Sequence, residues 1–220
     1  ERAIENEDGI AINLINLSIG YQRLGDREAA HAALREMIGS SFVQFPARRI
    51  AEAAFRSAVL LLEAEDVPAA ATALVRAREA CVEPACGLRG RLLNVQAQIA
   101  LLDKDFAGAR ALAEQALGIN RQEGEAAEQA NALRLMGAAL LELEQADAAQ
   151  RAVIEALAID KGLAQPVKIL VDLRLLGRIA TARGAREETR GYYERALAVA
   201  RAAGDRQATI DLEQLMRGLP

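Results

Sequence analysis

The residue types that could carry chemistry are few in this chain of 220 residues. Its one histidine, His31, rules out a relay or a metal site that needs two histidines. Aspartates and glutamates are plentiful, but carboxylates on exposed helices lack the burial that tunes an acid or a base. The sequence contains no glycine-rich phosphate loop, nucleophile elbow or metal-ligand spacing. We therefore expect no enzyme activity, no cofactor and no metal.

The two cysteines, Cys81 and Cys86, leave three interpretations open. They fit as small, half-buried apolar side chains at a helix boundary. They also fit as a local disulfide that joins a helix end to the next helix start, which would imply an oxidising compartment. A metal site has the weakest support, because no further cysteine or nearby histidine completes it. The sequence does not fix the compartment, which is the cytoplasm or, if the cysteines are bridged, the periplasm.

The composition indicates a helical globular chain. Hydrophobic residues make up 52% of it, aromatic residues only 3%, and tryptophan is absent. A core of alanine, leucine, isoleucine and valine favours close-packed helices. Lysine and arginine number 27 and aspartate and glutamate 31, a formal charge of −4 that argues against direct nucleic-acid binding. No run of 18 apolar residues occurs, so we expect no membrane-spanning helix.

An internal repeat organises the whole chain. Five times, an apolar segment is followed by a polar break and then by three residues at offsets of four and three, which are small, large and small in three of the copies. These offsets place the three residues on one face of a helix. The breaks begin at Gly25, Glu65, Lys104, Glu144 and Gly184, at a nearly constant step. A period of about 40 residues indicates a stack of helix pairs.

The repeat resembles the tetratricopeptide (TPR) motif, which has a Leu-Gly pair and a tyrosine on its first helix, a turn, and small and aromatic residues on its second helix. The matches are Leu17 and Tyr21 with Gly25, Asp26 and Ala30; Met136 and Gly137 with Ala149; and Leu176 and Gly177 with Gly184, Tyr193 and Ala196. The long period is similar to that of long-helix variants, such as the superhelical region of maltose-activator-type regulators and kinesin light chain repeats.

The resemblance implies an all-α fold, a right-handed superhelical solenoid of about five helix pairs followed by a C-terminal capping helix. We expect a single solenoid over residues 1–220 that forms part of a longer repeat protein. The expected repeats are 7–40, 47–82, 85–120, 125–160 and 166–203, with the capping helix at 205–217. In the third repeat, helices are predicted at 85–102 and 105–118.

The candidate site is the concave groove that first helices line in TPR proteins, where partners usually bind. Its expected residues form an apolar stretch in the first two repeats and carry basic or amide groups in the last three. The candidates are Ile15, Ile19, Phe55, Val59, Arg91, Asn94, Gln98, Asn131, Arg134, Arg174 and Arg178. Arginine and asparagine bind carboxylates and peptide amides directionally. The alternative is a solvated surface in which acids of the second helices pair with these arginines.

These features predict a non-catalytic scaffold that binds a protein or peptide, with an acidic or carboxylate-bearing segment in the groove. A second hypothesis is a sensor or regulatory segment of a larger bacterial signalling or transcription regulator. An enzyme is a remote third. We also expect self-association through the exposed face of the first repeat, because a repeat stack leaves its end faces open.

Overall fold

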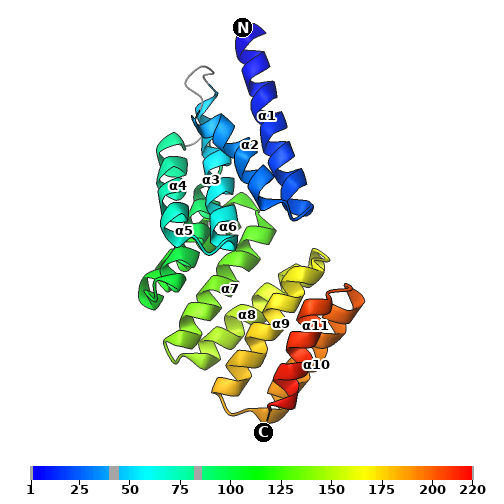
Figure 1. Cartoon of the computed structure of the whole chain (residues 1–220). Coiled ribbons are helices and arrows are strands. Elements are labelled where there is room, and N and C mark those ends of the chain that lie inside the picture. The colour runs from blue at the N-terminus through cyan, green and yellow to red at the C-terminus, as the bar shows by residue number, and fades with distance from the viewer. Residues whose placement is uncertain (1, 40–44, 82–85, 220) are drawn as a thin grey trace. The chain divides into compact units, whose positions relative to one another are not determined.

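The described residues of the computed structural model form eleven α-helices and no strands (Figure 1). The structure describes residues 2–39, 45–81 and 86–219. The helices are α1 (Arg2–Arg23), α2 (Arg27–Gly39), α3 (Ala47–Glu63), α4 (Val67–Ala80), α5 (Arg89–Leu102), α6 (Phe106–Glu123), α7 (Ala126–Glu142), α8 (Ala146–Gly162), α9 (Pro166–Ala182), α10 (Arg186–Ala202) and α11 (Arg206–Arg217).

The polar breaks are the turns that follow the first helices. The first residue of every break has a left-handed backbone, with φ values of 79° at Gly25, 62° at Glu65, 63° at Lys104, 60° at Glu144 and 70° at Gly184. A left-handed residue ends a helix and reverses the chain. In three of the turns an aspartate side chain then caps the next helix by accepting a hydrogen bond from a backbone N–H. These bonds are 3.0 Å at Asp26, 3.1 Å at Asp66 and 2.9 Å at Asp105.

Two predicted boundaries of the third repeat are wrong. Helix α5 begins at Arg89 and not at residue 85, because Gly87 has a φ of 64° that no helix allows. Helix α6 continues past Gly118 to Glu123, where Gly124, with a φ of 73°, ends it. An interior glycine costs a helix only about 1 kcal/mol, whereas a left-handed glycine at its end is a common terminator.

The chain divides into two compact units, unit 1 (residues 1–102) and unit 2 (residues 103–220). In each unit, helices pack on their neighbours in the sequence, and first helices also contact each other, as α1 does with α3 and α7 with α9. The core of unit 2 is centred on Leu173, Leu176, Ile179 and Tyr193. Unit 1 has two apolar clusters, one between α1, α2 and α3 and one between α3, α4 and α5. These helix pairs confirm the all-α repeat fold.

The first helix of each of the five repeats has a small residue at one shared position. The position lies seven residues before the break and is occupied by Ser18, Ala58, Ala97, Gly137 and Gly177, all of them buried. A Cβ atom on Gly137 would lie 2.3 Å from Cγ2 of Val153, and one on Gly177 would lie 2.4 Å from Cε1 of Tyr193. The two glycines therefore allow α7 and α9 to approach α8 and α10 closely.

Two residues of the first repeat lie outside the packing face that the TPR match assigns to them. Leu17 is 50% exposed and Tyr21 is 36% exposed, whereas Ile15 and Ser18 are buried against the rest of unit 1. In the fourth repeat the residues of the same register, Met136 and Leu140, border α6, the preceding second helix. Leu17 and Tyr21 instead line a surface pocket together with Gly20 and Leu24.

Candidate functional site

A cavity of about 390 Å³ opens between α1 and α3 and contains the most concentrated positive charge among the described cavities of unit 1. We call it the unit 1 arginine pocket. It is lined by Ile12, Ile15, Asn16, Ile19, Arg48, Arg49, Glu52, Arg56 and Cys86. The wall from α1 thus consists of three isoleucines and Asn16, and the wall from α3 is charged.

An ion-pair cluster joins α1 to α3 at the edge of this pocket. The Nε of Arg49 donates to Oδ1 of Asp8 over 2.7 Å, and Arg48 donates to Oδ2 over 3.2 Å. The Arg49 hydrogen bond lowers the pKa of Asp8 below its usual range, and the same bond raises the pKa of Arg49. Both groups therefore remain charged at neutral pH.

Glu52 is the second carboxylate at the pocket and is shared by two arginines. Its Oε1 lies 2.7 Å from Nε of Arg56, and its Oε2 lies 3.5 Å from Nη1 of Arg91 on α5. The Arg91 guanidinium also stacks over the Phe55 ring, 4.6 Å from its centroid. The pocket lining therefore contains three arginines and one glutamate, and Asp8 and Arg91 contact these residues from outside it.

The predicted groove residues of unit 1 differ in how much of their surface is exposed. Ile15 and Phe55 are core residues, each 6% exposed, and Asn94 is 1% exposed, so these three have little surface to offer a ligand. Ile19 and Val59 are half-buried, and Gln98 is exposed. Of the predicted set, Ile15 and Ile19 line the unit 1 arginine pocket, and Arg91 contacts it through Glu52.

In unit 2, Arg134 lies in the core and not on an open groove. Its side chain is held between α8 and α9, where Nη2 donates to Asp160 and Nε donates to Oδ1 of Asp172 over 2.6 Å. Arg134 is 8% exposed, Asp160 1% and Asp172 0%. The register of Arg134 matches the groove face and predicted a place there, but two buried aspartates already use its guanidinium.

The buried cluster of Arg134, Asp160 and Asp172 has one carboxylate more than it has cations. Oδ2 of Asp172 has no hydrogen-bond partner among the described residues. Burial raises the pKa of Asp172 to about 6, the nearby Asp160 adds to this rise, and Arg134 opposes it. Asp172 therefore holds its proton more tightly than an exposed aspartate does.

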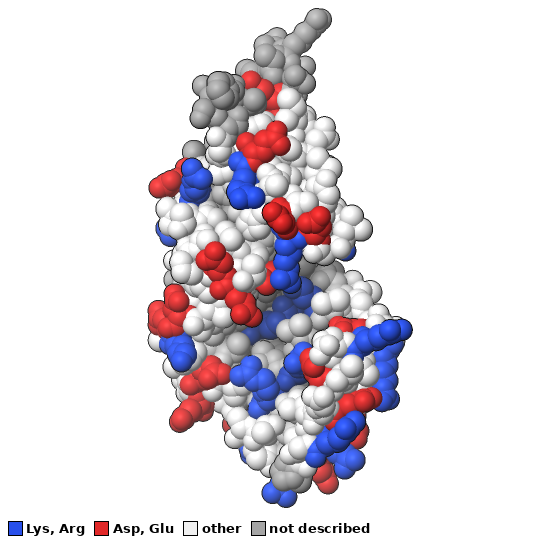
Figure 2. Space-filling model, in the orientation of Figure 1, with Lys and Arg blue, Asp and Glu red and all other residues white. Residues whose placement is uncertain are grey.

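The other candidates of unit 2 remain on the surface. Arg174 is exposed, and no ion pair involves it among the described residues. Arg178 is exposed and pairs with Glu142 of α7 over 3.0 Å. Asn131 is half-buried, and its Oδ1 lies 3.5 Å from Nη1 of Arg134. Binding of a ligand by Arg174 and Arg178 thus stays a prediction. Figure 2 shows that basic and acidic side chains alternate over much of the visible surface.

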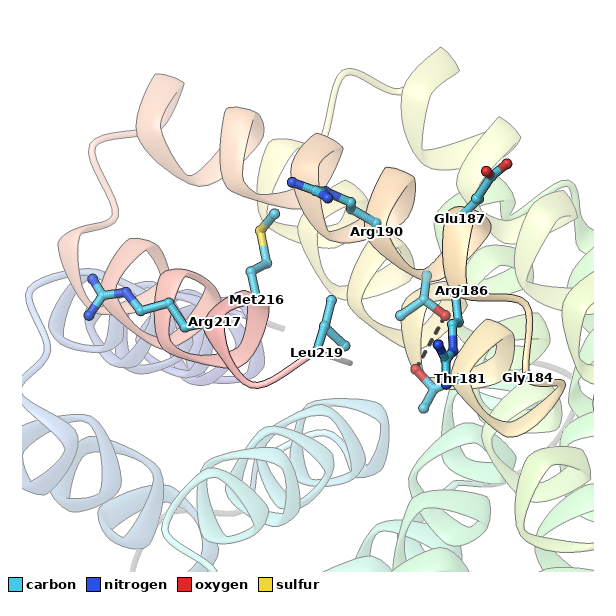
Figure 3. Close-up of a pocket in the computed structure, with 9 residues that line it drawn as sticks. Thr181, Gly184, Arg186, Glu187, Arg190, Met216, Arg217 and Leu219 are labelled. Carbon is cyan, nitrogen blue, oxygen red and sulfur yellow. Dashed lines mark hydrogen bonds between the residues drawn. The ribbon is translucent and has the colours of Figure 1, made fainter.

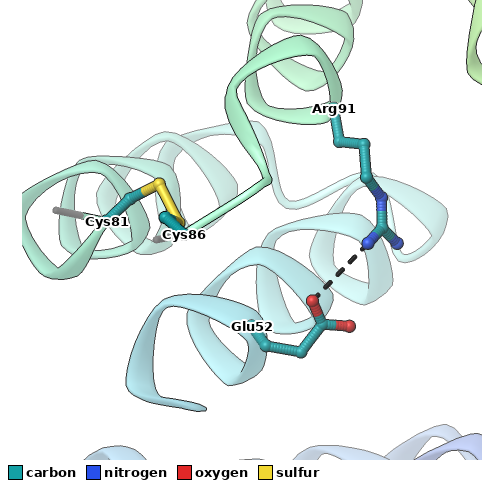
Figure 4. The surroundings of a disulfide bond; sticks show 4 residues. All are labelled: Glu52, Cys81, Cys86 and Arg91. Atoms are coloured by element: carbon teal, nitrogen blue, oxygen red, sulfur yellow. Dashed lines mark ion pairs between the residues drawn. A yellow bond between two sulfur atoms is a disulfide. The ribbon is translucent and has the colours of Figure 1, made fainter. Parts of the chain in front are cut away.

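The structure joins Cys81 and Cys86 by a disulfide, with their Cα atoms 5.2 Å apart (Figure 4). Cys81 follows α4, and Cys86 precedes α5 and lines the unit 1 arginine pocket. The bond therefore links the end of one helix pair to the first helix that carries Arg91.

Asp8, Arg48 and Arg49 were not among the residues that the sequence patterns predicted for the site. A signal for them exists, because Asp8 and Arg48 are one repeat length apart in the sequence. The ion pairs Glu52–Arg91 and Arg134–Asp172 have nearly the same separation along the chain. Opposite charges about one repeat apart on first helices are thus expected to meet across neighbouring repeats.

Comparison with known proteins identifies the fold. No family model matches the chain, and no curated protein matches its sequence. Among solved structures, aspartyl phosphate phosphatase F from Bacillus subtilis is similar with a TM-score of 0.72 and 18% identity over 90% of this chain and 53% of that one. A signal transduction ATPase with a tetratricopeptide repeat sensor from Pyrococcus horikoshii has a TM-score of 0.69 and 18% identity, over 90% of this chain and 31% of that one.

A kinesin light chain protein with TPR-like repeats from Podospora anserina matches over 93% of this chain and 98% of its own, with a TM-score of 0.63 and 15% identity. At these identities the likeness shows the fold alone, and that fold is the TPR-like helical repeat that the sequence predicts. The chain spans about half or less of the length of the first two structures.

Two kinds of site are missing from the part of the chain that the structure describes. None of its helices is both long and apolar enough to span a bilayer. Its described His, Cys, Asp and Glu side chains form no group of three that could hold a metal ion.

Proposed function

We propose that this chain is a non-catalytic protein-binding scaffold whose first-helix faces hold a peptide with apolar and acidic residues. The unit 1 arginine pocket carries this proposal, because an isoleucine wall faces a charged wall with more arginines than carboxylates. Arginine binds carboxylates through paired hydrogen bonds, and isoleucine side chains gain by covering apolar groups. The shared TPR-like fold supports a role in protein interaction.

A binding assay with designed peptides tests this proposal. We expect a labelled peptide of alternating leucine and glutamate to bind more tightly than the leucine–glutamine version, and the leucine–lysine version to bind weakest. The double variant Arg48→Gln/Arg91→Gln should weaken the acidic peptide about tenfold, since charged hydrogen bonds contribute about 1.5–3 kcal/mol. The matched control Arg35→Gln/Arg76→Gln removes the same charge from the exposed surfaces of α2 and α4. Equal affinity of the two double variants for the acidic peptide would show that the unit 1 arginine pocket does not bind it.

For unit 2, Arg174→Glu is the informative change, because Arg174 is exposed and unpaired among the described residues. Charge reversal at Arg134 would instead disrupt the core. A partner retained by wild type and lost by Arg174→Glu supports recognition by the α9 surface, and a partner retained by both excludes it.

A second candidate function is a sensor or regulatory segment of a larger protein. The observation that favours it is the likeness to a signal transduction ATPase with a tetratricopeptide repeat sensor. This chain covers 31% of that protein. A neighbouring ATPase or DNA-binding domain in the same polypeptide, with activity that changes on ligand binding to this segment, would favour this function over the scaffold.

We further propose that the open face of α1 mediates self-association. Leu17 and Tyr21 are 50% and 36% exposed on one side of that helix, and Leu24, in the turn that follows it, is 82% exposed. Sedimentation should detect a dimer in wild type that Leu17→Glu/Leu24→Glu dissociates. The control is Val75→Glu, which alters an apolar residue of α4 that is 52% exposed. A wild-type monomer at high concentration contradicts the proposal.

A further inference from the structure

The unit 1 arginine pocket has a cleavable covalent bond in its lining, because Cys86 both lines the pocket and forms the disulfide with Cys81. Its three arginines all come from α3. In the cavity of about 490 Å³ between α9, α10 and α11, by contrast, Arg186 and Arg217 lie on opposite sides (Figure 3). Peptide binding by the unit 1 arginine pocket does not by itself require a disulfide, so the bond has a role still to be explained.

Helix α5, which follows Cys86, lacks the side-chain cap that its neighbours have. The residue before α5 is Leu88, whose side chain has no acceptor for the free backbone N–H groups of a helix start. The helices before and after it, α4 and α6, are capped by Asp66 and Asp105 over 3.1 and 2.9 Å. The start of α5 is therefore less well stabilised by its own hydrogen bonds.

The first turn of α5 is also unfavourable in charge and in helix propensity. It begins with Arg89, Gly90 and Arg91 and contains no acidic residue. Cations are disfavoured at the positive end of the helix dipole, and glycine is a poorer helix former than alanine. The disulfide thus supplies a restraint that the local sequence does not, since it ties the chain just before this turn to the end of α4.

Arg91 couples this turn to the pocket. Its Nη1 lies 3.5 Å from Oε2 of the pocket residue Glu52, and its guanidinium lies over the Phe55 ring. Figure 4 shows the disulfide and the Glu52–Arg91 ion pair beside the start of α5. Leu88 and Leu92 are 4% and 6% exposed in the apolar cluster of α3, α4 and α5, so reduction should loosen the first turn without unfolding the helix. A loosened turn takes Arg91 away from Glu52, and the edge of the pocket loses a positive charge.

We propose that the Cys81–Cys86 disulfide is a redox control of the unit 1 arginine pocket, in which the bridged form binds the acidic peptide more tightly than the reduced form does. This control rests on the peptide binding proposed above. Because redox state and affinity are linked, the bound peptide in turn makes the bond harder to reduce by the same factor.

The reductant is an external dithiol, because the two cysteines of the chain are both in the bond. One thiolate of the dithiol attacks a sulfur of the disulfide and displaces the other cysteine as a thiolate, which takes up a proton. The second thiol then attacks the mixed disulfide, releases the remaining cysteine and closes the disulfide of the reagent. Two electrons and two protons pass from the dithiol to the protein. Cys81 and Cys86 are half-buried, so the core does not enclose them.

The test measures the affinity of the labelled leucine–glutamate peptide for the whole chain before and after treatment with dithiothreitol. We expect about three- to tenfold weaker binding after reduction, since a charged contact is lost, and full recovery after reoxidation. The neutral leucine–glutamine peptide should lose less affinity, because the pocket changes mainly in charge. The Cys81→Ser/Cys86→Ser variant should bind as the reduced chain does and should not respond to dithiothreitol.

Two single variants test whether the coupling passes through Arg91. Arg91→Gln should bind the acidic peptide more weakly in the bridged form and lose its response to dithiothreitol. Arg89→Gln is the matched control, because it removes an exposed charge from the same turn and should keep the response.

The outcomes separate this control from peptide binding itself. Failure of the acidic peptide to bind either form would overturn the proposed function together with the redox control. Equal affinity of the bridged and reduced forms would overturn the redox control alone. An equal loss for the acidic and neutral peptides, or an undiminished response in Arg91→Gln, would do the same.

Discussion

Among single residues, the most informative are those of the buried cluster of Arg134, Asp160 and Asp172. A cation and two carboxylates leave water only if their hydrogen bonds replace hydration, and one Asp172 oxygen has no such bond among the described residues. The cluster is thus held together by Arg134 and weakened by its own excess negative charge. Both properties lead to measurable predictions.

The first prediction concerns how the stability of unit 2 depends on pH. Because the folded-state pKa of Asp172 is raised to about 6, the folded protein binds this proton more tightly than the unfolded chain does. The contribution of Asp172 to stability is therefore greatest at low pH and is lost as pH rises through about 6. We expect Asp172→Asn, which resembles the protonated form, to raise the urea midpoint of unit 2 at pH 8 more than at pH 5. A constant difference between variant and wild type from pH 5 to pH 8 would contradict this.

The second prediction concerns Arg134, the cation of the cluster. Arg134→Gln leaves two buried carboxylates without their charge partner and should cost about 3–5 kcal/mol of unfolding free energy. Arg174→Gln is the matched control, since it removes an exposed arginine without an ion pair among the described residues and should change stability by less than about 0.5 kcal/mol. Chemical denaturation of the two variants checks the contrast, and equal effects would show that the cluster is not structural.

Between helices, close pairing in unit 2 depends on the small residue seven positions before each break. Alanine is a better helix former than glycine by about 1 kcal/mol, so Gly137→Ala would stabilise α7 if space allowed. The Val153 side chain of α8 occupies that space. At Gly137 the gain in helix propensity thus opposes the cost of overpacking, and the overpacking cost decides the sign of the change in unfolding free energy.

We expect Gly137→Ala to destabilise unit 2 by about 1–3 kcal/mol, the usual cost of overpacking. In a Val153→Ala background the same change should become neutral or stabilising, because the clashing Cγ2 atom is gone. A double-mutant cycle of thermal or urea unfolding measures this coupling. An equal cost in both backgrounds would mean that α7 and α8 are not held together by this contact.

Across the chain as a whole, the disulfide and the buried ion-pair cluster belong to different units. The bond between Cys81 and Cys86 lies in unit 1, and the cluster around Arg134 lies in unit 2. Each is therefore expected to stabilise its own unit.

Reduction should lower the stability of unit 1 by about 2 kcal/mol, the loop-entropy value for so short a loop. Hydrogen exchange should become faster in α4 and α5 after reduction, with unit 2 little changed. The Cys81→Ser/Cys86→Ser variant serves as the control, because its exchange should not respond to a reductant. Unaltered exchange in reduced wild type would show that the bond contributes nothing to unit 1.

The helix pairs and their order could be predicted from the amino-acid sequence alone. Periodic breaks, small residues on helix faces and a constant repeat step are local patterns, and Glu65, Lys104 and Glu144 adopt the left-handed backbone that those patterns require. The register also assigned the right residues to first helices, including Ile19 and Arg91. A helix face, however, only limits where a side chain can point.

Packing between helices determines which of those residues are free, and no local pattern contains that information. Arg134 and Arg174 lie one repeat apart and share one register, yet Arg134 is buried between two aspartates and Arg174 is exposed. Asp160 belongs to the end of α8 and Asp172 to α9, so only packing brings them to one guanidinium.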